Sequence, residues 1–280
     1  MHLFKNKSQP LLMGILNVTP DSFSDGGRYA DKDAAVKHAL QMMEEGAAII
    51  DIGGESTRPG AAPVSAEEEI KRVAPVIETL ADEAKARGVW LSLDTRNAAT
   101  MRAGLKAGAR MINDVSALTH DAESMKVLAA ADCAVVLMHM QGDPQSMQKN
   151  PHYQDVVREV YEYLAARIAA CVAAGISKDR IIADPGIGFG KTAGQSRMLL
   201  ENTDTFAALG VPVLIGASRK SFLGGKTPED RLPASLAAAL LAASKGAAIL
   251  RVHDVAETRE ALKLMHNHSL RHSRVSGNPV

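Results

Sequence analysis

Eight short apolar stretches of the chain each end in polar or glycine-rich residues that could bind a ligand. These ends read NVTPDSFSDGG, DIGGESTRPG, LDTR, INDV, MHMQGDP, ADPGIGFGK, GASRKSF and RVHD. One or two polar ends would be ordinary capping of the helices that follow. Eight of them indicate that the ends meet and form one binding site.

The last two ends carry hydroxyl, cationic and imidazole groups at Ser218, Arg219, Lys220, Arg251 and His253. One arginine side chain can bind two phosphate oxygens through two parallel N–H bonds, and a histidine can donate a hydrogen bond to them. Residues two apart on a strand share a face, so Arg251 and His253 point the same way. We predict an anion site here. The alternative for Arg251 is an ion pair with Asp254 or another acid at a strand end, and the alternative for His253 is a structural role.

A second group consists of Asp94, Asn113 and Asp184, which follow the third, fourth and sixth apolar stretches. Two carboxylates and an amide suit a flat heterocycle, because a carboxylate can accept two parallel N–H bonds from an aminopyrimidinone edge. The alternative is that Asp94 and Asp184 cap the next helices. A metal site built from protein side chains is disfavoured, since no His–carboxylate spacing of that kind occurs. Nucleophile-elbow and P-loop motifs are also missing from the sequence.

The elements that would position these groups follow a repeated pattern of helix, glycine and apolar run. A glycine just past a helix end adopts the left-handed conformation without strain. The apolar runs do not alternate with polar residues, as expected of parallel strands covered on both faces. Six glycines precede such a run: Gly46, Gly88, Gly108, Gly175, Gly210 and Gly246. Two further strands are predicted at 11–18 and 133–140, which makes eight.

Alanine-rich, periodic segments between the strands predict helices, and the clearest cover 31–45, 65–87, 154–174, 228–245 and 254–268. Pro75 and Pro233 within them mark a kink or a first turn. Eight strand–helix units over about 260 residues predict an α/β protein with one domain, a (β/α)₈ TIM barrel spanning 1–268. An open doubly wound sheet is the alternative, but no G-x-G-x-x-G motif opens the first unit. The segment 269–280 has no periodicity and is predicted to be disordered.

Composition argues against several classes of protein. Lys and Arg number 32 and Asp and Glu number 32, so the basic surplus of a nucleic-acid-binding protein is absent. No apolar stretch reaches the roughly 18 residues of a membrane span, and the N-terminus has no apolar core of a signal peptide. Cys133 and Cys171 cannot make a disulfide framework and have the surroundings of buried apolar residues. We therefore expect a soluble, cytoplasmic protein that binds neither nucleic acid nor membranes.

Eight motifs together resemble those of dihydropteroate synthase, the folate-pathway enzyme that sulfonamides inhibit. They are MGILNVTPDSFSDGG, DIGGESTRPGA, SLDT, INDVSA, VLMHMQGDPQSMQ, ADPGIGFGK, GASRKSFLG and RVHDV, and the resemblance covers about residues 11–264. It implies a transferase that condenses (7,8-dihydropterin-6-yl)methyl diphosphate with 4-aminobenzoate to give 7,8-dihydropteroate and diphosphate. It also implies Mg²⁺ bound to the diphosphate, a (β/α)₈ fold and a homodimer.

The resemblance assigns roles to residues of both groups. Pterin binding falls to Asp94, Asn113, Asp184, Phe189, Gly216 and Lys220. The catalytic residues among them are Asp94, Asp184 and Lys220. Diphosphate binding falls to Asn17, acting through Mg²⁺, and to Thr57, Arg58, Arg251 and His253. The aminobenzoate pocket falls to Thr57, Pro59, Phe189 and Ser221. The loops 21–27 and 54–63 would close over the substrates.

The implied reaction starts with departure of diphosphate, which leaves a delocalised pterin cation for the aryl amine to attack. Electrostatic stabilisation would be the main catalytic contribution, and Asp94 would help to stabilise the positive charge. One alternative of the same fold is a pterin-binding methyltransferase domain with a corrinoid partner, but it has no reason to carry both Arg251 and His253. Another is a pterin-binding module without activity, which would be expected to lack Lys220, Asp94 or the loops.

Overall fold

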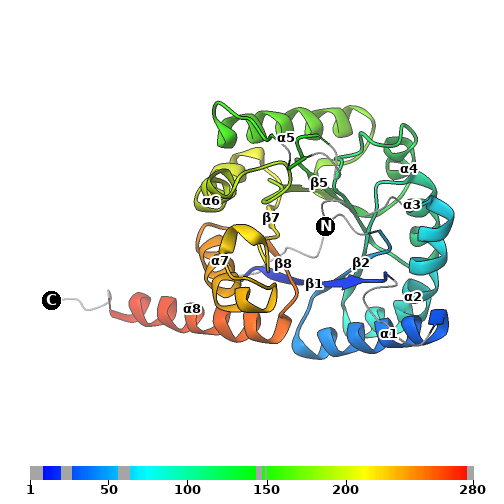
Figure 1. The fold of residues 1–280 in the computed structure, drawn as a ribbon, viewed down its shortest axis with the longest axis horizontal. Coiled ribbons are helices and arrows are strands. Elements are labelled where there is room, and N and C mark those ends of the chain that lie inside the picture. Colours follow the sequence, from blue (N-terminus) through cyan, green and yellow to red (C-terminus); the bar gives the residue numbers. More distant parts are fainter. Residues whose placement is uncertain (1–8, 20–26, 56–63, 143–146, 149, 276–280) are drawn as a thin grey trace.

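The computed structural model describes residues 9–19, 27–55, 64–142, 147–148 and 150–275. Within these residues, eight parallel strands lie in the middle of the molecule and α-helices surround them (Figure 1). The strands are β1 Leu11–Asn17, β2 Ile49–Gly53, β3 Trp90–Asp94, β4 Met111–Asp114, β5 Ala134–Met138, β6 Ile181–Asp184, β7 Leu214–Ile215 and β8 Ile249–Val252. All eight predicted strands are therefore present.

The strands close into a barrel. Their order in the sheet is β6-β5-β4-β3-β2-β1-β8-β7, and a parallel bridge between Ala183 and Val213 joins the two outer strands. At this seam the Ala183 amide donates a hydrogen bond to the Pro212 carbonyl oxygen at 2.9 Å. Because the two ends of the sheet meet, the structure confirms the predicted (β/α)₈ barrel and excludes the open doubly wound sheet.

Helices follow the strands and cover the outside of the barrel (Figure 1). The α-helices are α1 Gly27–Glu45, α2 Ala66–Arg87, α3 Ala98–Ala107, α4 Ser124–Ala129, α5 Val156–Ala173, α6 Ala193–Glu201, α7 Leu232–Ser244 and α8 Val255–Val275. The six glycines predicted to follow helix ends all have positive φ, between 68° and 118°. Pro233 lies in the first turn of α7 as predicted, whereas Pro75 lies inside α2. Among the described residues, no helix is both long and apolar enough to cross a membrane.

The C-terminal segment differs from the prediction of disorder over 269–280. Helix α8 continues to Val275 and extends past the other helices (Figure 1), so residues 269–275 are helical. The physical reason is that SLRHSRV contains no glycine or proline, and Gly277 is the first residue that disfavours a helix. Extending an existing helix costs little, because each added residue gains one backbone hydrogen bond. Residues 276–280 lie outside the described part of the chain.

Two groups of buried apolar residues hold the barrel together, a large one between strands and helices and a smaller one inside. The inner group consists of Leu11, Met13, Ile49, Met111, Ala134, Val136, Ile182, Leu214 and Ile249. Side chains two residues apart on a strand share a face. On β2, Asp51 therefore follows Ile49 on the inner face, and on β8, Arg251 follows Ile249. The interior thus changes from apolar to polar at the carboxyl ends of the strands, where active sites of this fold lie.

Candidate active site

A buried carboxylate, Asp51 on β2, lies at the centre of the polar end of the barrel. It is fully buried and accepts hydrogen bonds from Ser92 Oγ at 2.6 Å, Asn113 Nδ2 at 2.9 Å and Arg251 Nε at 2.6 Å. A charge removed from water needs partners of this kind, because burial alone strongly disfavours it. Asp51 is absent from the predicted site, although its inward position two residues after Ile49 is a signal that could have found it.

Arg251 on β8 bridges two acids across the barrel. Its Nε donates to Asp51, and its Nη2 donates to Asp94 Oδ2 at 2.9 Å. The ion pair considered as the alternative for Arg251 is therefore present, with Asp51 and Asp94 as the acids instead of Asp254. Burial and the Asp51 carboxylate raise the pKa of Asp94 to about 8, although Arg251 acts in the opposite direction. Asp94 is thus a carboxyl group that can gain or lose its proton near neutral pH.

Neither Asp94 nor Asp184 caps a helix. The residue that precedes α3 is Asn97, and the one that precedes α6 is Thr192. The capping interpretation of both acids is therefore wrong, and both side chains are available to the barrel interior. Asn113 lies between them on β4, where the register pairs it with Asp94 on β3.

Asp184 and Lys220 form the other half of the site. Asp184 is buried, its Oδ1 accepts the Gly186 N–H at 2.7 Å, and burial raises its pKa. Lys220 Nζ donates to the Ile187 carbonyl oxygen and lies 4.1 Å from the centre of the Phe189 ring. Burial lowers the pKa of Lys220 to about 7, while the charge of Asp184 acts to raise it. The two groups therefore lie near enough to sense each other's charge.

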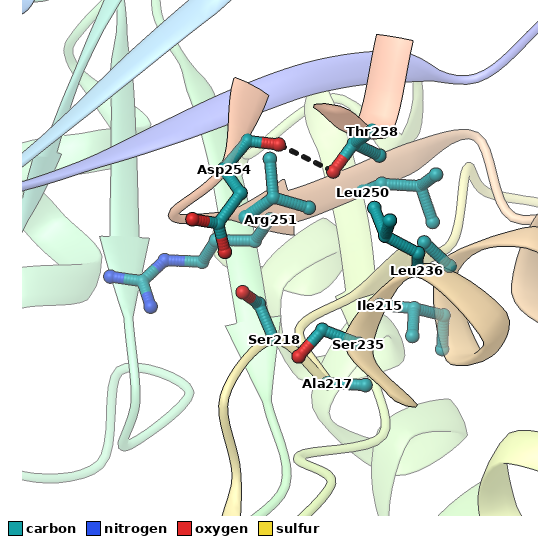
Figure 2. Close-up of a pocket in the computed structure, with 11 residues that line it drawn as sticks. Ile215, Ala217, Ser218, Ser235, Leu236, Leu250, Arg251, Asp254 and Thr258 are labelled. Carbon is teal, nitrogen blue, oxygen red and sulfur yellow. Dashed lines mark hydrogen bonds between the residues drawn. The ribbon is translucent and has the colours of Figure 1, made fainter. Parts of the chain in front are cut away.

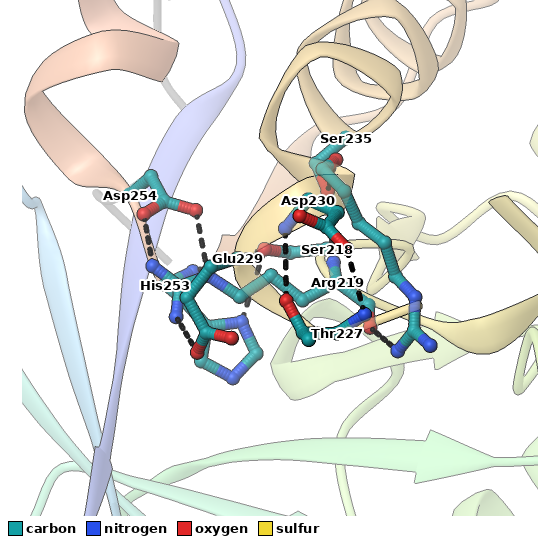
Figure 3. Close-up of polar contacts among 9 residues, drawn as sticks. Ser218, Arg219, Thr227, Glu229, Asp230, Ser235, His253 and Asp254 are labelled. Carbon is teal, nitrogen blue, oxygen red and sulfur yellow. Dashed lines mark hydrogen bonds and ion pairs between the residues drawn. The ribbon is translucent and has the colours of Figure 1, made fainter. Parts of the chain in front are cut away.

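Two residue pairs join the loops that follow β7 and β8, Ser218 with His253 and Arg219 with Asp254 (Figure 3). Ser218 Oγ lies 3.0 Å from His253 Nδ1. Arg219 donates to both carboxylate oxygens of Asp254, at 3.0 and 2.5 Å, and adopts a φ of 57°, which is unusual for a residue with a side chain. Arg219 therefore connects the two loops, and Arg251 and His253 remain the candidates for binding an anion.

A cavity behind these loops is separate from the polar end of the barrel. It lies between β7, β8, α7 and α8, and its apolar lining includes Ile215, Leu236 and Leu250. Figure 2 shows that Arg251 borders this cavity with its carbon chain and that its guanidinium points away from it. On the other side, the Thr258 hydroxyl donates to the Asp254 carbonyl oxygen at 2.6 Å. The cavity is thus a gap in the packing behind the site, and the guanidinium serves the barrel interior.

The remaining predicted residues lie at the same end of the barrel or outside the described residues. Asn17 ends β1 and is half-buried. Gly216 follows β7, and a Cβ placed on it would lie 3.7 Å from the Cβ of Arg251. Ser221 is exposed and begins a short 3₁₀ helix, η5 Ser221–Leu223. The predicted loop residues outside the described part of the chain are Thr57, Arg58 and Pro59, together with 21–26.

Side chains of α2 and of the loop after β3 hold the two ends of the loop 54–63. The Glu55 carboxylate pairs with Arg96 at 3.3 Å and accepts the Val64 N–H at 3.2 Å. Arg72 Nη1 donates to the Gly54 carbonyl oxygen at 3.0 Å. The segment that contains the predicted loop residues of the diphosphate site therefore begins and ends beside the carboxyl end of β2.

Comparisons with known proteins agree with this geometry. The model of the pterin-binding enzyme family matches residues 13–253. Dihydropteroate synthase of Escherichia coli strain K12 is 48% identical over 261 residues, which cover 92% of this chain and 91% of that protein. A structure of Xanthomonas albilineans dihydropteroate synthase with 4-aminobenzoic acid has a TM-score of 0.87 and 49% identity, with 94% of each chain covered. Another from the same organism, in complex with 7,8-dihydropteroate, has a TM-score of 0.85 and 45% identity, covering 96% of this chain and 95% of that one.

Fold and site together define the class, a (β/α)₈ enzyme that binds pterins at the carboxyl ends of its strands. The family match spans most of the barrel, from β1 to the end of β8. The chain therefore belongs to the pterin-binding enzyme family and, within it, to the dihydropteroate synthases.

Replacing Asp51 by asparagine should destabilise the fold. Asp51→Asn leaves the Arg251 guanidinium with one carboxylate instead of two, and breaking a buried ion pair costs about 3 kcal/mol of unfolding free energy. Urea denaturation measures this loss. The matched control is Asp204→Asn, which removes an exposed partner of Lys245 and should leave the midpoint unchanged, because solvent screens such pairs. Equal midpoints for both variants would contradict the central role of Asp51.

Replacing Asp94 by asparagine should flatten the dependence of stability on pH. The pKa of Asp94 is about 8 in the folded chain, against an ordinary value of 3.8. Between these values the folded state holds the proton more tightly, so the contribution of Asp94 to stability is full at low pH and is lost as the pH rises through 8. From about pH 5 to 8, Asp94→Asn should therefore lose less unfolding free energy than the wild type. Urea denaturation measures both proteins over this range. If their unfolding free energies decline equally as the pH rises, Asp94 does not titrate there.

Proposed function

We propose that the chain condenses (7,8-dihydropterin-6-yl)methyl diphosphate with 4-aminobenzoate, giving 7,8-dihydropteroate and diphosphate. The observation that carries the proposal is the polar end of the barrel, where Asp94 and Asp184 lie at the same mouth as Arg251 and His253. Carboxylates suit the N–H groups of a pterin, and a guanidinium with an imidazole suits a diphosphate. A substrate in which a pterin is joined to a diphosphate would contact the carboxylates and the guanidinium–imidazole pair at the same time.

The pterin would lie between the two halves of the site. Asp184 would accept paired N–H bonds from the aminopyrimidinone edge, supported by its burial and by the backbone bond that orients its carboxyl group. Asn113 would bind the same ring from β4. Lys220 would donate to ring acceptors, with the Phe189 ring beside it as a flat surface and Gly216 leaving space near Arg251.

Catalysis would rest on electrostatic stabilisation of the breaking bond. The C–O bond breaks first, its electron pair leaves with the diphosphate, and positive charge spreads over the pterin. Asp94 would stabilise this charge, because a nearby cation lowers the pKa of a carboxyl group and favours its ionised form. The amine nitrogen of 4-aminobenzoate then attacks the methylene carbon and loses a proton. The amine is neutral at physiological pH, so no strong general base is needed.

The departing diphosphate would be held by Arg251 and His253, with Thr57 and Arg58 from the loop 54–63. Arg251 has five N–H groups; it uses Nε and Nη2 for Asp51 and Asp94 and can offer others to phosphate oxygens. The aminobenzoate would be bound by Thr57 and by three further residues, Pro59, Phe189 and Ser221. The exposed position of Ser221 beside Lys220 supports an entrance for this second substrate.

Mg²⁺ would bind through Asn17 and the diphosphate. Mg²⁺ commonly takes one or two protein oxygens together with substrate phosphates and water. Asn17 fits, because it offers an amide oxygen at the carboxyl end of β1, next to β8, which carries Arg251. In the described residues, no three His, Cys, Asp or Glu side chains gather into a metal-binding group. Substrate and water would supply the other ligands. When bound, Mg²⁺ would neutralise charge on the leaving group.

We also propose that the chain forms a homodimer and works in the cytoplasm. The apolar side chains of Met198 on α6 and Leu264 on α8 are exposed, and α7 packs against both of these helices. Exposed apolar side chains on these two helices support association with a second copy. The thiols of Cys133 and Cys171 are buried and unpaired, which supports a reducing compartment.

Diphosphate release by the purified chain with Mg²⁺ and the pterin diphosphate should require 4-aminobenzoate. His253→Ala should lower kcat by about 10²-fold, because it removes a group that stabilises charge on the departing diphosphate. The control His152→Ala alters an exposed side chain outside the site and should match the wild type. Release without 4-aminobenzoate, or equal rates for the two variants, would contradict the proposed reaction or the role of His253, respectively.

Removal of Mg²⁺ with a chelator should abolish release, and adding the ion back should restore it. Asn17→Ala should raise the Mg²⁺ concentration for half-maximal rate about tenfold, because it removes one oxygen ligand. Its rate at saturating Mg²⁺ should approach that of the wild type. A Mg²⁺ titration that is unchanged in the variant would show that Asn17 does not bind the ion.

A further inference from the structure

The loop that follows β6, residues 186–190, is held by side chains from several parts of the chain. We call this segment, GIGFG, the glycine loop. Four successive carbonyl groups in it each accept a hydrogen bond from a side chain. The donors are Lys220 to Ile187, Gln148 to Gly188 at 2.5 Å, Lys191 to Phe189 at 2.9 Å and Tyr153 to Gly190 at 2.9 Å. Side chains have therefore replaced the secondary structure that normally satisfies backbone carbonyl groups.

The glycine loop lies directly against the segment that follows β5. A Cβ on Gly186 would overlap the carbonyl oxygen of His139, and one on Gly190 would lie 2.5 Å from the carbonyl oxygen of Gln141. Gly186 and Gly190 also have φ of 67° and 61°, which only glycine adopts without strain. Close approach and backbone conformation both require glycine here, so the two segments behave as one packed unit.

Lys191 is the side chain that joins these two segments. It is only 3% exposed, and its Nζ lies 2.9 Å from His139 Nδ1, 3.2 Å from the His139 carbonyl oxygen and 2.9 Å from the Phe189 carbonyl oxygen. The two carbonyl oxygens accept N–H bonds from the lysine, and the His139 ring nitrogen is its third partner. The His139 ring is fixed in turn by an edge-on contact with Tyr163, with ring centres 4.8 Å apart.

The position of Lys220 depends on the same loop. Its Nζ has two contacts that define its place, a hydrogen bond to the Ile187 carbonyl oxygen and the Phe189 ring at 4.1 Å. Both partners belong to the glycine loop. A shift of the Phe189 backbone would therefore move the ring and the ammonium together, while the contacts of the β8 half, such as Arg251 with Asp51, would stay in place.

We propose that Lys191 is a positioning residue for the pterin half of the site. By binding Phe189 and His139 together, it holds the glycine loop in the shape that presents Phe189 and Lys220 to the pterin. This rests on the proposed function only in naming the pterin as the ligand. The Nζ of Lys191 is directed at His139 and at the Phe189 carbonyl oxygen, so its effect passes through Phe189 and Lys220. The diphosphate half is built on β8 and the loop after β7 and should not depend on it.

The test compares binding at the two halves in Lys191→Met, which keeps the length of the side chain and removes its N–H groups. Calorimetry with 6-hydroxymethylpterin measures the pterin half, and calorimetry with inorganic diphosphate and Mg²⁺ measures the anion half. We expect pterin affinity to fall about tenfold or more, because the carbonyl oxygens of His139 and Phe189 lose a donor and the His139 ring loses a partner. Affinity for diphosphate should stay within about twofold. Lys245→Met, at a half-buried lysine that pairs with Asp204 outside the barrel, should change neither.

Tyr153→Phe is a second variant, and we expect it to fold. It deletes only the hydroxyl group that donates to the Gly190 carbonyl oxygen. It should weaken pterin binding in the same direction by a smaller factor, and it decides the question if Lys191→Met does not fold. Unchanged pterin affinity in the folded variants would overturn the proposal, and so would an equal loss at both halves. Because pterin binding needs no turnover, the result is separate from the outcome of the diphosphate-release assay.

Discussion

The negative charge of Asp51, buried inside the barrel, is the interaction on which the polar end of the structure depends. It draws together Ser92, Asn113 and Arg251 from three other strands. Arg251 in turn reaches Asp94, so hydrogen bonds and ion pairs connect β2, β3, β4 and β8 at the point where their apolar packing stops. Burial raises the pKa of Asp94, and the charge of Asp51 raises it further. One carboxylate thus shapes both the geometry of the site and the protonation of its neighbour.

The other half of the site is organised by a different interaction. Around Asp184 the chain leaves β6 as the glycine loop, and side chains bind its carbonyl groups one after another. Here the Nζ of Lys220 donates its hydrogen bond to a carbonyl oxygen of the loop instead of to a carboxylate. A pterin placed between the two halves would contact fixed charges on one side and a backbone held by buried donors on the other. Such preorganisation is what electrostatic catalysis requires.

Much of the fold could be predicted because its signals are local. A glycine at a helix end and an uninterrupted apolar run are properties of short segments. Six strands are predicted from both signals, and the strands at 11–18 and 133–140 from the apolar run. The helical structure of residues 269–275 is harder to predict, because a helix can be extended by residues that show no apolar periodicity. Arg219 shows why the site is harder to predict than the strands. Its neighbours in sequence suggest that it binds an anion, but its guanidinium binds Asp254, which lies 35 residues away in sequence.

The sequence by itself determined which residues stand at the carboxyl ends of the strands, since strand period and chain order place them there. It also determined the family, through motifs spread over most of the chain. Only the tertiary structure decided which of these groups pair. The partners of Asp51 lie 41, 62 and 200 residues away in sequence. Arg251 meets the others because the last strand, β8, pairs with the first, β1, which lets its side chain reach across to β2 and β3.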